Sequence, residues 1–289
     1  MLGSTLTKVL CADGHEVIEL NRSGLATVKT NEIIKFDVQN LNSLADLLRD
    51  RDFAYIINCI GLIKQRFDEN SLKDAESAIL INSQFPLHLN DTALKLGIKL
   101  IQIGTDCVYS GTKGSYTEND SFDPIDLYGR SKLKGEQSSL TSMILRTSII
   151  GVEDRSAYSL LSWLLSQPKK FDVNGFTNHF WNGVTTFHFS QIISGVIKSD
   201  YFIPGITHLV PLNVLSKFEI LRVAAERFGR DDLCIREFET INPIDRSLST
   251  VEEFRNQTLW ALGGYDKIPA IEKMISDYAN WCKSEIEIS

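Results

Sequence analysis

The chain has 289 residues, 43% of them apolar and 23% charged, a globular balance that excludes a disordered or fibrous protein. Its 30 basic and 37 acidic residues give a net charge of −7, which argues against nucleic-acid binding. The five cysteines are scattered without a C-x-x-C pair, and no apolar run approaches the ~20 residues of a membrane span. We therefore expect a cytoplasmic protein with no disulfide framework, zinc site or membrane contact.

Helices and strands alternate in the first half of the chain, according to the spacing of its apolar residues. Helices are predicted at residues 4–13, 41–48, 75–96 and 128–137. Strands are predicted at residues 15–20, 55–59, 99–103 and 143–145. Gly14 and Gly97 stand where the first and third of these helices should end. Such alternation is typical of a parallel sheet covered by helices on both faces.

This pattern predicts a Rossmann-like, doubly wound α/β fold. We expect a dinucleotide-binding domain at residues 1–150 and a smaller, mixed substrate-binding region at 151–289, partly interleaved with it. A doubly wound domain normally begins with a strand and a glycine-rich turn, whereas this sequence begins at the mouth of its first helix. We therefore expect that about ten residues, one strand plus a turn, are missing from the start.

The most informative motif is a Tyr-x-x-x-Lys, formed by Tyr128 and Lys132. On a helix these two side chains lie on one face, and a nearby ammonium lowers the pKa of a phenol from its usual value of about 10. Such a tyrosine exchanges protons with a carbonyl or an alcohol near neutral pH. The spacing alone is also common on solvated helix faces. Thr105 adds context because it follows the strand at 99–103, although a threonine there also suits a turn or cap.

Several further motifs extend this pattern. They are Thr105-Asp106, Tyr116-Thr117-Glu118, Pro124, the run YGRSKLKGE at 128–136, NCIG at 58–61, Asn82 and LRTSIIG at 145–151. Together they resemble the extended short-chain dehydrogenase/reductases, and most of all their dTDP-4-dehydrorhamnose reductase branch. The resemblance covers most of residues 1–150. It is looser from 151 to 289, where residues 206–210 and 244–247 still fit the layout of that family.

The resemblance implies a catalytic role for five residues. Tyr128 would protonate the keto oxygen of a sugar, while Lys132 would lower the pKa of Tyr128 and bind the nicotinamide ribose. Thr105 would align the same carbonyl, with Asp106 as its usual neighbour. Asn82 matches an asparagine that supports a proton relay in related reductases.

A nicotinamide cofactor is implied in the same way. The backbone at Gly3, near a helix N-terminus, would face the pyrophosphate. Arg22 and Ser23, after the strand at 15–20, suit a 2′-phosphate, so we expect NADPH and keep NADH as the alternative. If the cofactor is NADH, Arg22 would be a solvent-exposed charge on a loop. The resemblance places Asp37 and Val38 at the adenine, and Ile60 and Gly61 near the ribose.

The expected substrate is a nucleotide-linked 4-keto-6-deoxy sugar that serves surface polysaccharide synthesis. Thr105 would contact the sugar, and Asn174 and Phe176, in a predicted loop at 174–178, would shape its pocket. Arg246 would reach the diphosphate. We expect no metal, and the resemblance leaves a homodimer open.

Two alternatives remain at the level of sequence. A nucleotide-sugar epimerase or dehydratase of the same fold would retain NAD without net consumption of reduced cofactor. The dehydratase usually carries an Asp-Glu pair after the threonine, whereas here Asp106 is followed by Cys107. The other alternative is a non-catalytic NAD(P)-binding regulatory subunit, such as that of methionine adenosyltransferase, which resembles the same branch.

Overall fold

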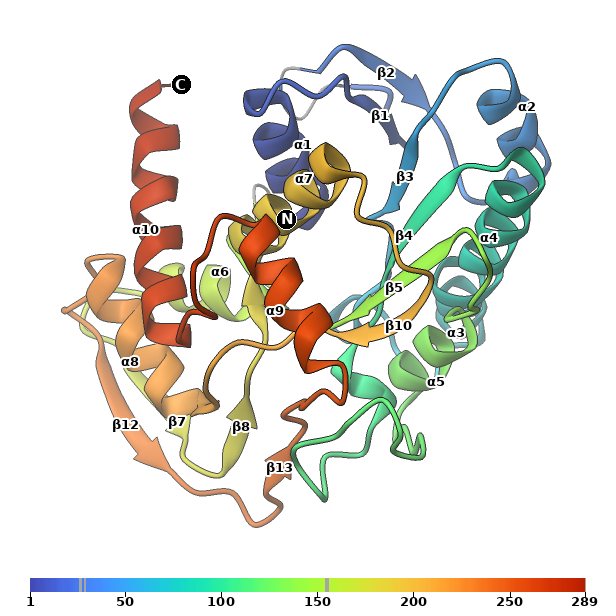
Figure 1. Cartoon of the computed structure of the whole chain (residues 1–289). Helices are drawn as coiled ribbons and strands as arrows, with labels where there is room; N and C mark the ends of the chain where they lie inside the picture. Colours follow the sequence, from blue (N-terminus) through green and yellow to red (C-terminus); the bar gives the residue numbers. More distant parts are fainter. Residues whose placement is uncertain (26–27, 29, 154–155, 289) are drawn as a thin grey trace.

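The computed structural model describes residues 1–25, 28, 30–153 and 156–288 (Figure 1). Its main sheet has four parallel strands in the order β10-β5-β4-β3. These strands are β3 (Tyr55–Asn58), β4 (Lys99–Ile103), β5 (Ser142–Arg146) and β10 (Gly205–His208). A separate parallel pair is formed by β1 (Ile18–Asn21) and β2 (Glu32–Lys35). The predicted α/β class with a buried parallel sheet is therefore confirmed.

Ten α-helices are present in the described part of the chain. They are α1 (Leu2–Ala12), α2 (Leu44–Arg49), α3 (Leu72–Ile79), α4 (Phe85–Leu96), α5 (Leu127–Lys134), α6 (Leu160–Leu165), α7 (Thr186–Ser199), α8 (Lys217–Arg227), α9 (Glu253–Leu262) and α10 (Ile271–Ile288). Short 3-10 turns are η1 (Leu41–Ser43), η2 (Lys64–Arg66) and η4 (Asp106–Val108). No helix among the described residues is both long and apolar enough to cross a bilayer.

The remaining strands lie outside the main sheet. They are β6 (Ile149–Ile150), β7 (Asp172–Phe176), β8 (His179–Trp181), β9 (Val184–Thr185), β11 (Leu215–Ser216), β12 (Cys234–Phe238) and β13 (Ile244–Asp245). Strand β7 pairs with β12, β6 pairs with β9, and β8 lies between β11 and β13. Strands β7, β8, β12 and β13 lie in the lower part of the molecule in Figure 1.

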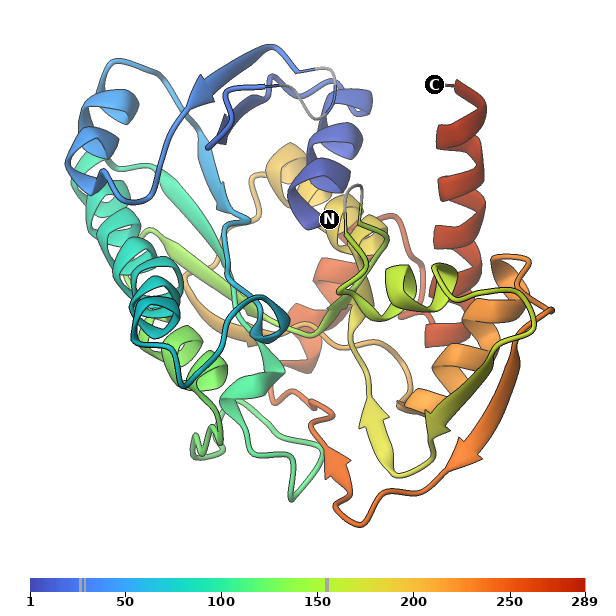
Figure 2. The same cartoon turned by 180° about the vertical axis from the view of Figure 1, so that it is seen from behind.

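The main sheet is buried on both faces, and adjacent residues of β4 show this directly. Leu100 packs into a cluster with Leu44 of α2 and Leu89 of α4, whereas Ile101 packs into a second cluster with Leu6 of α1. Successive side chains of a strand point to opposite faces, so the two clusters lie on the two sides of the sheet. Figures 1 and 2 show α2, α4 and α5 together on one side and α1, α7 and α9 on the other.

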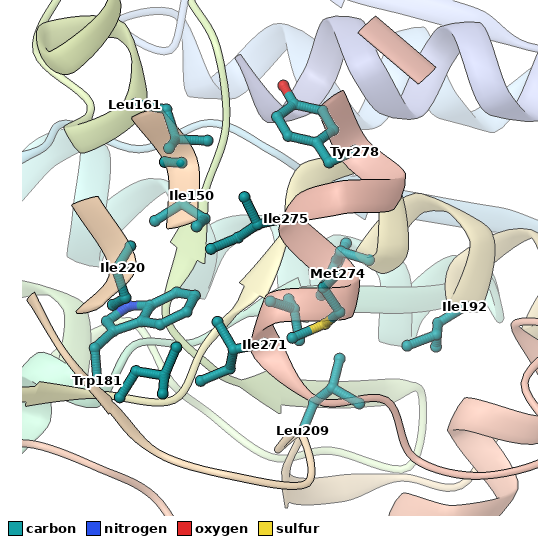
Figure 3. Close-up of a cluster of buried hydrophobic side chains, with 14 of the residues drawn as sticks. Ile150, Leu161, Trp181, Ile192, Leu209, Ile220, Ile271, Met274, Ile275 and Tyr278 are labelled. Atoms are coloured by element: carbon teal, nitrogen blue, oxygen red, sulfur yellow. The ribbon is translucent and has the colours of Figure 1, made fainter. Parts of the chain in front are cut away.

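The second half of the chain completes both layers. Strand β10 pairs with β5, and α7 packs along α1. Helix α10 contributes Ile271, Met274, Ile275 and Tyr278, at helical spacing, to a core shared with β8 and α8 (Figure 3). The two halves of the chain are thus joined by one continuous apolar core.

The long helix predicted at 75–96 is interrupted by a π turn, η3 (Leu80–Gln84). Pro86 has no backbone N–H, so it cannot continue the hydrogen-bond ladder back to Asn82. The π turn packs closely against the end of α5. A Cβ on Gly135, the residue after α5, would lie only 2.1 Å from the Asn82 carbonyl oxygen. The π turn therefore brings Asn82 beside the helix that carries the Tyr-x-x-x-Lys motif.

Candidate active site

Thr105 follows the carboxyl end of β4, where a buried glycine precedes it. A Cβ on Gly104 would lie 2.7 Å from Oε1 of Glu136 and 3.0 Å from Cα of Arg146, so a larger residue does not fit there. Thr105 is buried, and its Oγ1 donates to Oδ1 of Asp106 over 3.1 Å and accepts the N–H of Cys107 over 3.2 Å. The hydroxyl is therefore held by its own turn directly after the strand.

Helix α5 places Tyr128 and Lys132 over this turn. Asp126 caps its first turn, with Oδ1 accepting the Gly129 N–H over 2.8 Å. A Cβ on Gly129 would lie 2.1 Å from the carbonyl oxygen of Cys107. This close approach requires glycine beside the tyrosine, and it presses the start of the helix onto the segment that follows β4.

The phenol of Tyr128 lies near the Thr105 hydroxyl, so two hydroxyl groups are present at the strand end. Removal from water raises the pKa of Tyr128 above its usual value, and the acidic groups of Cys107, Asp106 and Asp126 favour the same direction, while the Thr105 hydroxyl opposes it. The pKa of Tyr128 is therefore raised in the free protein, and the role of Lys132 in lowering it stays a prediction. Nζ of Lys132 donates to the carbonyl oxygen of Ile103 over 2.8 Å.

Two neighbours of Thr105 are also shifted by burial. Removal from water raises the pKa of Asp106, although Arg246 and the Thr105 hydroxyl oppose the shift. Burial and the nearby Asp106 raise the pKa of the Cys107 thiol to about 12. Cys107 is therefore a neutral thiol at physiological pH.

Asn82 links two segments of the structure through its side-chain amide. Its Oδ1 accepts the Leu62 N–H over 2.8 Å, and its Nδ2 donates to the Leu62 carbonyl over 2.9 Å and to Oγ of Ser131 over 3.1 Å. It thereby ties the loop after β3 to α5. The proton-relay role implied by the resemblance stays a prediction.

The residues expected at a dinucleotide follow β1, β2 and β3. Arg22 and Ser23 form an exposed turn, in which Oγ of Ser23 donates to Oδ1 of Asn21 over 3.0 Å. Asp37 and Val38 are half-buried directly after β2. Ile60 and Gly61 follow β3, with the Ile60 N–H bonded to Oδ1 of Asn58 over 3.0 Å.

Gly3 lies in the first turn of α1, which has no side-chain cap and no acidic residue. The unpaired N–H groups of such a turn are suited to an anion. A Cβ on Gly3 would lie 3.5 Å from Cβ of Cys59, so the helix starts beside the end of β3. The contact of Gly3 and the Ile60-Gly61 backbone with a dinucleotide stays a prediction.

The pocket residues predicted beyond 150 are only partly brought together. Arg246 is half-buried, and its Nε donates to the carbonyl oxygen of Tyr109 over 3.0 Å. The predicted loop at 174–178 is wrong, because Asn174 and Phe176 belong to strand β7. Asn174 is exposed there, whereas the Phe176 ring lies 4.7 Å from the ring of His179.

Sequence reasoning missed two groups near Arg246. Lys217 is half-buried at the start of α8, with Nζ 6.0 Å from the centre of the Phe176 ring. Burial lowers its pKa, as does Arg246, while Asp106 and Cys107 oppose the shift. His179 is buried, and its Nδ1 has no hydrogen-bond partner among the described residues. Only the tertiary fold brings these groups together, because β8, α8 and β13 are far apart in the sequence.

A parallel sheet with this threonine, tyrosine and lysine at one strand end defines an α/β protein of the short-chain dehydrogenase/reductase type. Comparison with known families agrees. Residues 1–253 match the family described as RmlD substrate binding domain, and the chain belongs to that family.

Individual relatives are more distant. The chain is 24% identical to dTDP-4-dehydrorhamnose reductase of Mycolicibacterium smegmatis over 82% of its length and 69% of that protein. It is 30% identical to the probable low-salt glycan biosynthesis reductase Agl14 of Haloferax volcanii, over 52% of its length and only 50% of that protein. The crystal structure of dTDP-4-dehydrorhamnose reductase from Bacillus anthracis in complex with NADP shares the fold, with a TM-score of 0.69 and 16% identity over 90% of this chain and 97% of that one.

Proposed function

We propose that the protein is an NADPH-dependent reductase of a nucleotide-linked 4-keto-6-deoxy sugar, acting in the synthesis of surface polysaccharide precursors. One observation carries the proposal: the hydroxyl groups of Thr105 and Tyr128 meet at the carboxyl end of β4, with Lys132 one helical turn further along α5. Two such hydroxyls can hold a single carbonyl oxygen. The reductases reported above, with their family, support the same reaction class.

The cofactor would be held along the strand ends. The uncapped first turn of α1 would bind the pyrophosphate, and Ile60-Gly61 and Lys132 would lie along the ribose of the nicotinamide. Arg22 is exposed on the turn after β1, where a guanidinium can bind a 2′-phosphate bidentately. This residue is the reason for preferring NADPH to NADH.

The protein's own contribution to the reaction is to orient the carbonyl and donate the proton. A raised pKa keeps the Tyr128 phenol protonated before the reaction, as a proton donor must be. A bound reduced nicotinamide would supply the hydride to the carbonyl carbon. The carbonyl oxygen takes the phenol proton, so that the ketone becomes an alcohol, and the Lys132 cation stabilises the phenolate that remains.

The anionic part of the substrate would lie against Lys217, Arg246 and His179. Lys217 and Arg246 both act electrostatically on Asp106, so their charges lie beside the catalytic turn. Both cations are half-buried; Arg246 donates to the Tyr109 carbonyl, Lys217 lies over the Phe176 ring, and neither forms an ion pair within the described residues. A diphosphate satisfies two such cations and the unpaired Nδ1 of His179.

The test is NADPH consumption at 340 nm with a panel of nucleotide-linked 4-keto sugars. We expect stoichiometric oxidation of NADPH, with a lower KM for NADPH than for NADH. Turnover of a sugar without net cofactor consumption would identify an epimerase instead. No turnover, together with copurification of a stoichiometric partner, would identify a regulatory subunit. The neutral Cys107 thiol argues against a dehydratase, because it cannot replace the second acidic group.

A further inference from the structure

A buried ion pair lies directly behind the catalytic helix. Nη2 of Arg146 lies 2.6 Å from Oε2 of Glu136, and Nε of Arg146 lies 3.2 Å from the same oxygen. The two side chains are 0% and 1% exposed. Arg146 thus uses only one oxygen of the carboxylate, and Oε1 has no hydrogen-bond partner among the described residues.

The unpaired Oε1 of Glu136 faces the strand end that carries the candidate active site. A Cβ built on Gly104 would be only 2.7 Å from Oε1 of Glu136. The preceding residue, Ile103, holds Nζ of Lys132 through its carbonyl oxygen at 2.8 Å. Glu136 also follows Lys132 by four residues, just beyond the C-terminal end of α5. The strand end at Ile103–Gly104 therefore lies against both the ammonium of Lys132 and the carboxylate of Glu136.

Lys132 needs a counter-charge, because it is only 8% exposed and forms no ion pair in the described part of the structure. Burial lowers the pKa of its amine, and the opposing groups are Glu136, just beyond the end of α5, and Cys107 on the segment after β4. Cys107 is a neutral thiol near pH 7, since its pKa is about 12. Glu136 is therefore the anion that acts on Lys132 under physiological conditions.

We infer that Glu136, fixed by Arg146, is a positioning residue that keeps the buried Lys132 amine protonated and so maintains the positive charge beside Tyr128. That the charge matters for catalysis rests on the proposed function. That Glu136 keeps Lys132 charged does not depend on it. The competing explanation is that Glu136 and Arg146 merely hold the fold together, as many buried pairs do.

The two explanations differ in the titration of Lys132, which can be followed by NMR of ε-¹³C-labelled lysine in the cofactor-free protein. Lys132→Arg identifies the resonance. We expect Glu136→Gln to lower the pKa of Lys132 by about 1 unit, the usual effect of removing a close opposite charge. Glu118→Gln removes another half-buried carboxylate that does not act on Lys132, and it should leave this titration unchanged.

Glu136→Gln leaves Arg146 buried and unpaired, which destabilises the fold. A double variant, Glu136→Gln with Arg146→Met, removes both charges and should recover stability while Lys132 still titrates at the lowered pKa. An unchanged Lys132 titration in either folded variant would overturn the inference and leave a purely structural pair. Because no turnover is measured, this result stands or falls independently of the proposed reductase activity.

Discussion

Tyr128 is the residue on which the proposed chemistry depends. Its phenol meets the Thr105 hydroxyl, and its raised pKa keeps the proton in place until the carbonyl takes it. We expect Tyr128→Phe to lower kcat by about 10²- to 10⁴-fold, the usual contribution of a positioned acid. The Kd for NADPH, measured by fluorescence titration, should change little.

Tyr201→Phe provides the matched control, because Tyr201 lies in the connection from α7 to β10, away from the strand ends that carry the site. Tyr201→Phe also removes a phenol hydroxyl, but at a position outside the site, and should leave kcat unchanged. A Tyr128→Phe enzyme with wild-type turnover would refute the assignment of the proton donor.

Lys217 and Arg246 are expected to bind substrate rather than to take part in proton transfer. Replacing either with Met should raise KM for the nucleotide sugar by about 10- to 100-fold, the loss of a hydrogen bond to a charged group. The Kd for NADPH should stay unchanged. Lys267→Met, on an exposed lysine, serves as the control for net charge. An effect confined to NADPH binding would contradict the assignment of this site to the substrate.

At the scale of elements, the contact between α5 and the turn after β4 sets the geometry of the site. Gly129 permits it, because any Cβ there would overlap the Cys107 carbonyl oxygen. We expect Gly129→Ala to destabilise the protein by about 1–3 kcal/mol, as overpacking does, and to lower kcat by displacing Tyr128. Chemical unfolding measures the first effect.

Gly61→Ala is the appropriate comparison for stability, since its new Cβ would meet nothing closer than Oδ1 of Asn82 at 3.8 Å. Equal stability of the two variants would show that the close packing of α5 is less strict than the structure implies.

The elements that carry the catalytic turn could be predicted from sequence, and others could not. The predicted strand at 99–103 is observed as β4 over those same residues, because three of its five residues, Leu100, Ile101 and Ile103, are apolar and give a clear signal. Strand β2 (Glu32–Lys35) was missed, since only its two central residues are apolar.

Strand β7 was interpreted as a loop because Asn174 and Gly175 are uncommon in strands. Pairing with β12 overrides that propensity. Gly175 is needed for a different reason, as a Cβ there would lie 2.8 Å from Cα of Phe218 in α8. Lys217 was missed for a related reason: its proximity to Asp106 arises from tertiary packing that no local pattern records.

At the scale of the whole molecule, Glu118 links the two halves of the chain. Its carboxylate accepts the N–H of His208 over 2.7 Å, the Thr250 hydroxyl over 2.6 Å and the Val251 N–H over 2.9 Å. Burial alone would raise the pKa of Glu118, but these hydrogen bonds together lower it below its usual value.

A lowered folded-state pKa gives stability that is present above the unfolded-state value of about 4.3 and is lost as the pH falls through the folded-state value. We therefore expect Glu118→Gln to be less stable than the wild type at pH 7, with a difference that shrinks below about pH 4. Urea unfolding across this pH range checks it. The exposed Glu76→Gln should show no such trend, and a constant difference for Glu118→Gln would contradict the linkage.

We propose above all that reduced cofactor, together with Thr105 and Tyr128, reduces a ketone at C4 of a nucleotide-linked sugar. The most direct test uses NADPH that carries deuterium at both C4 positions of the nicotinamide, followed by NMR of the sugar product. We expect deuterium at C4 of the sugar, one per NADPH oxidised, and none with Tyr128→Phe on the same timescale. Product that carries no deuterium, or carries it at another carbon, would contradict the proposed reduction.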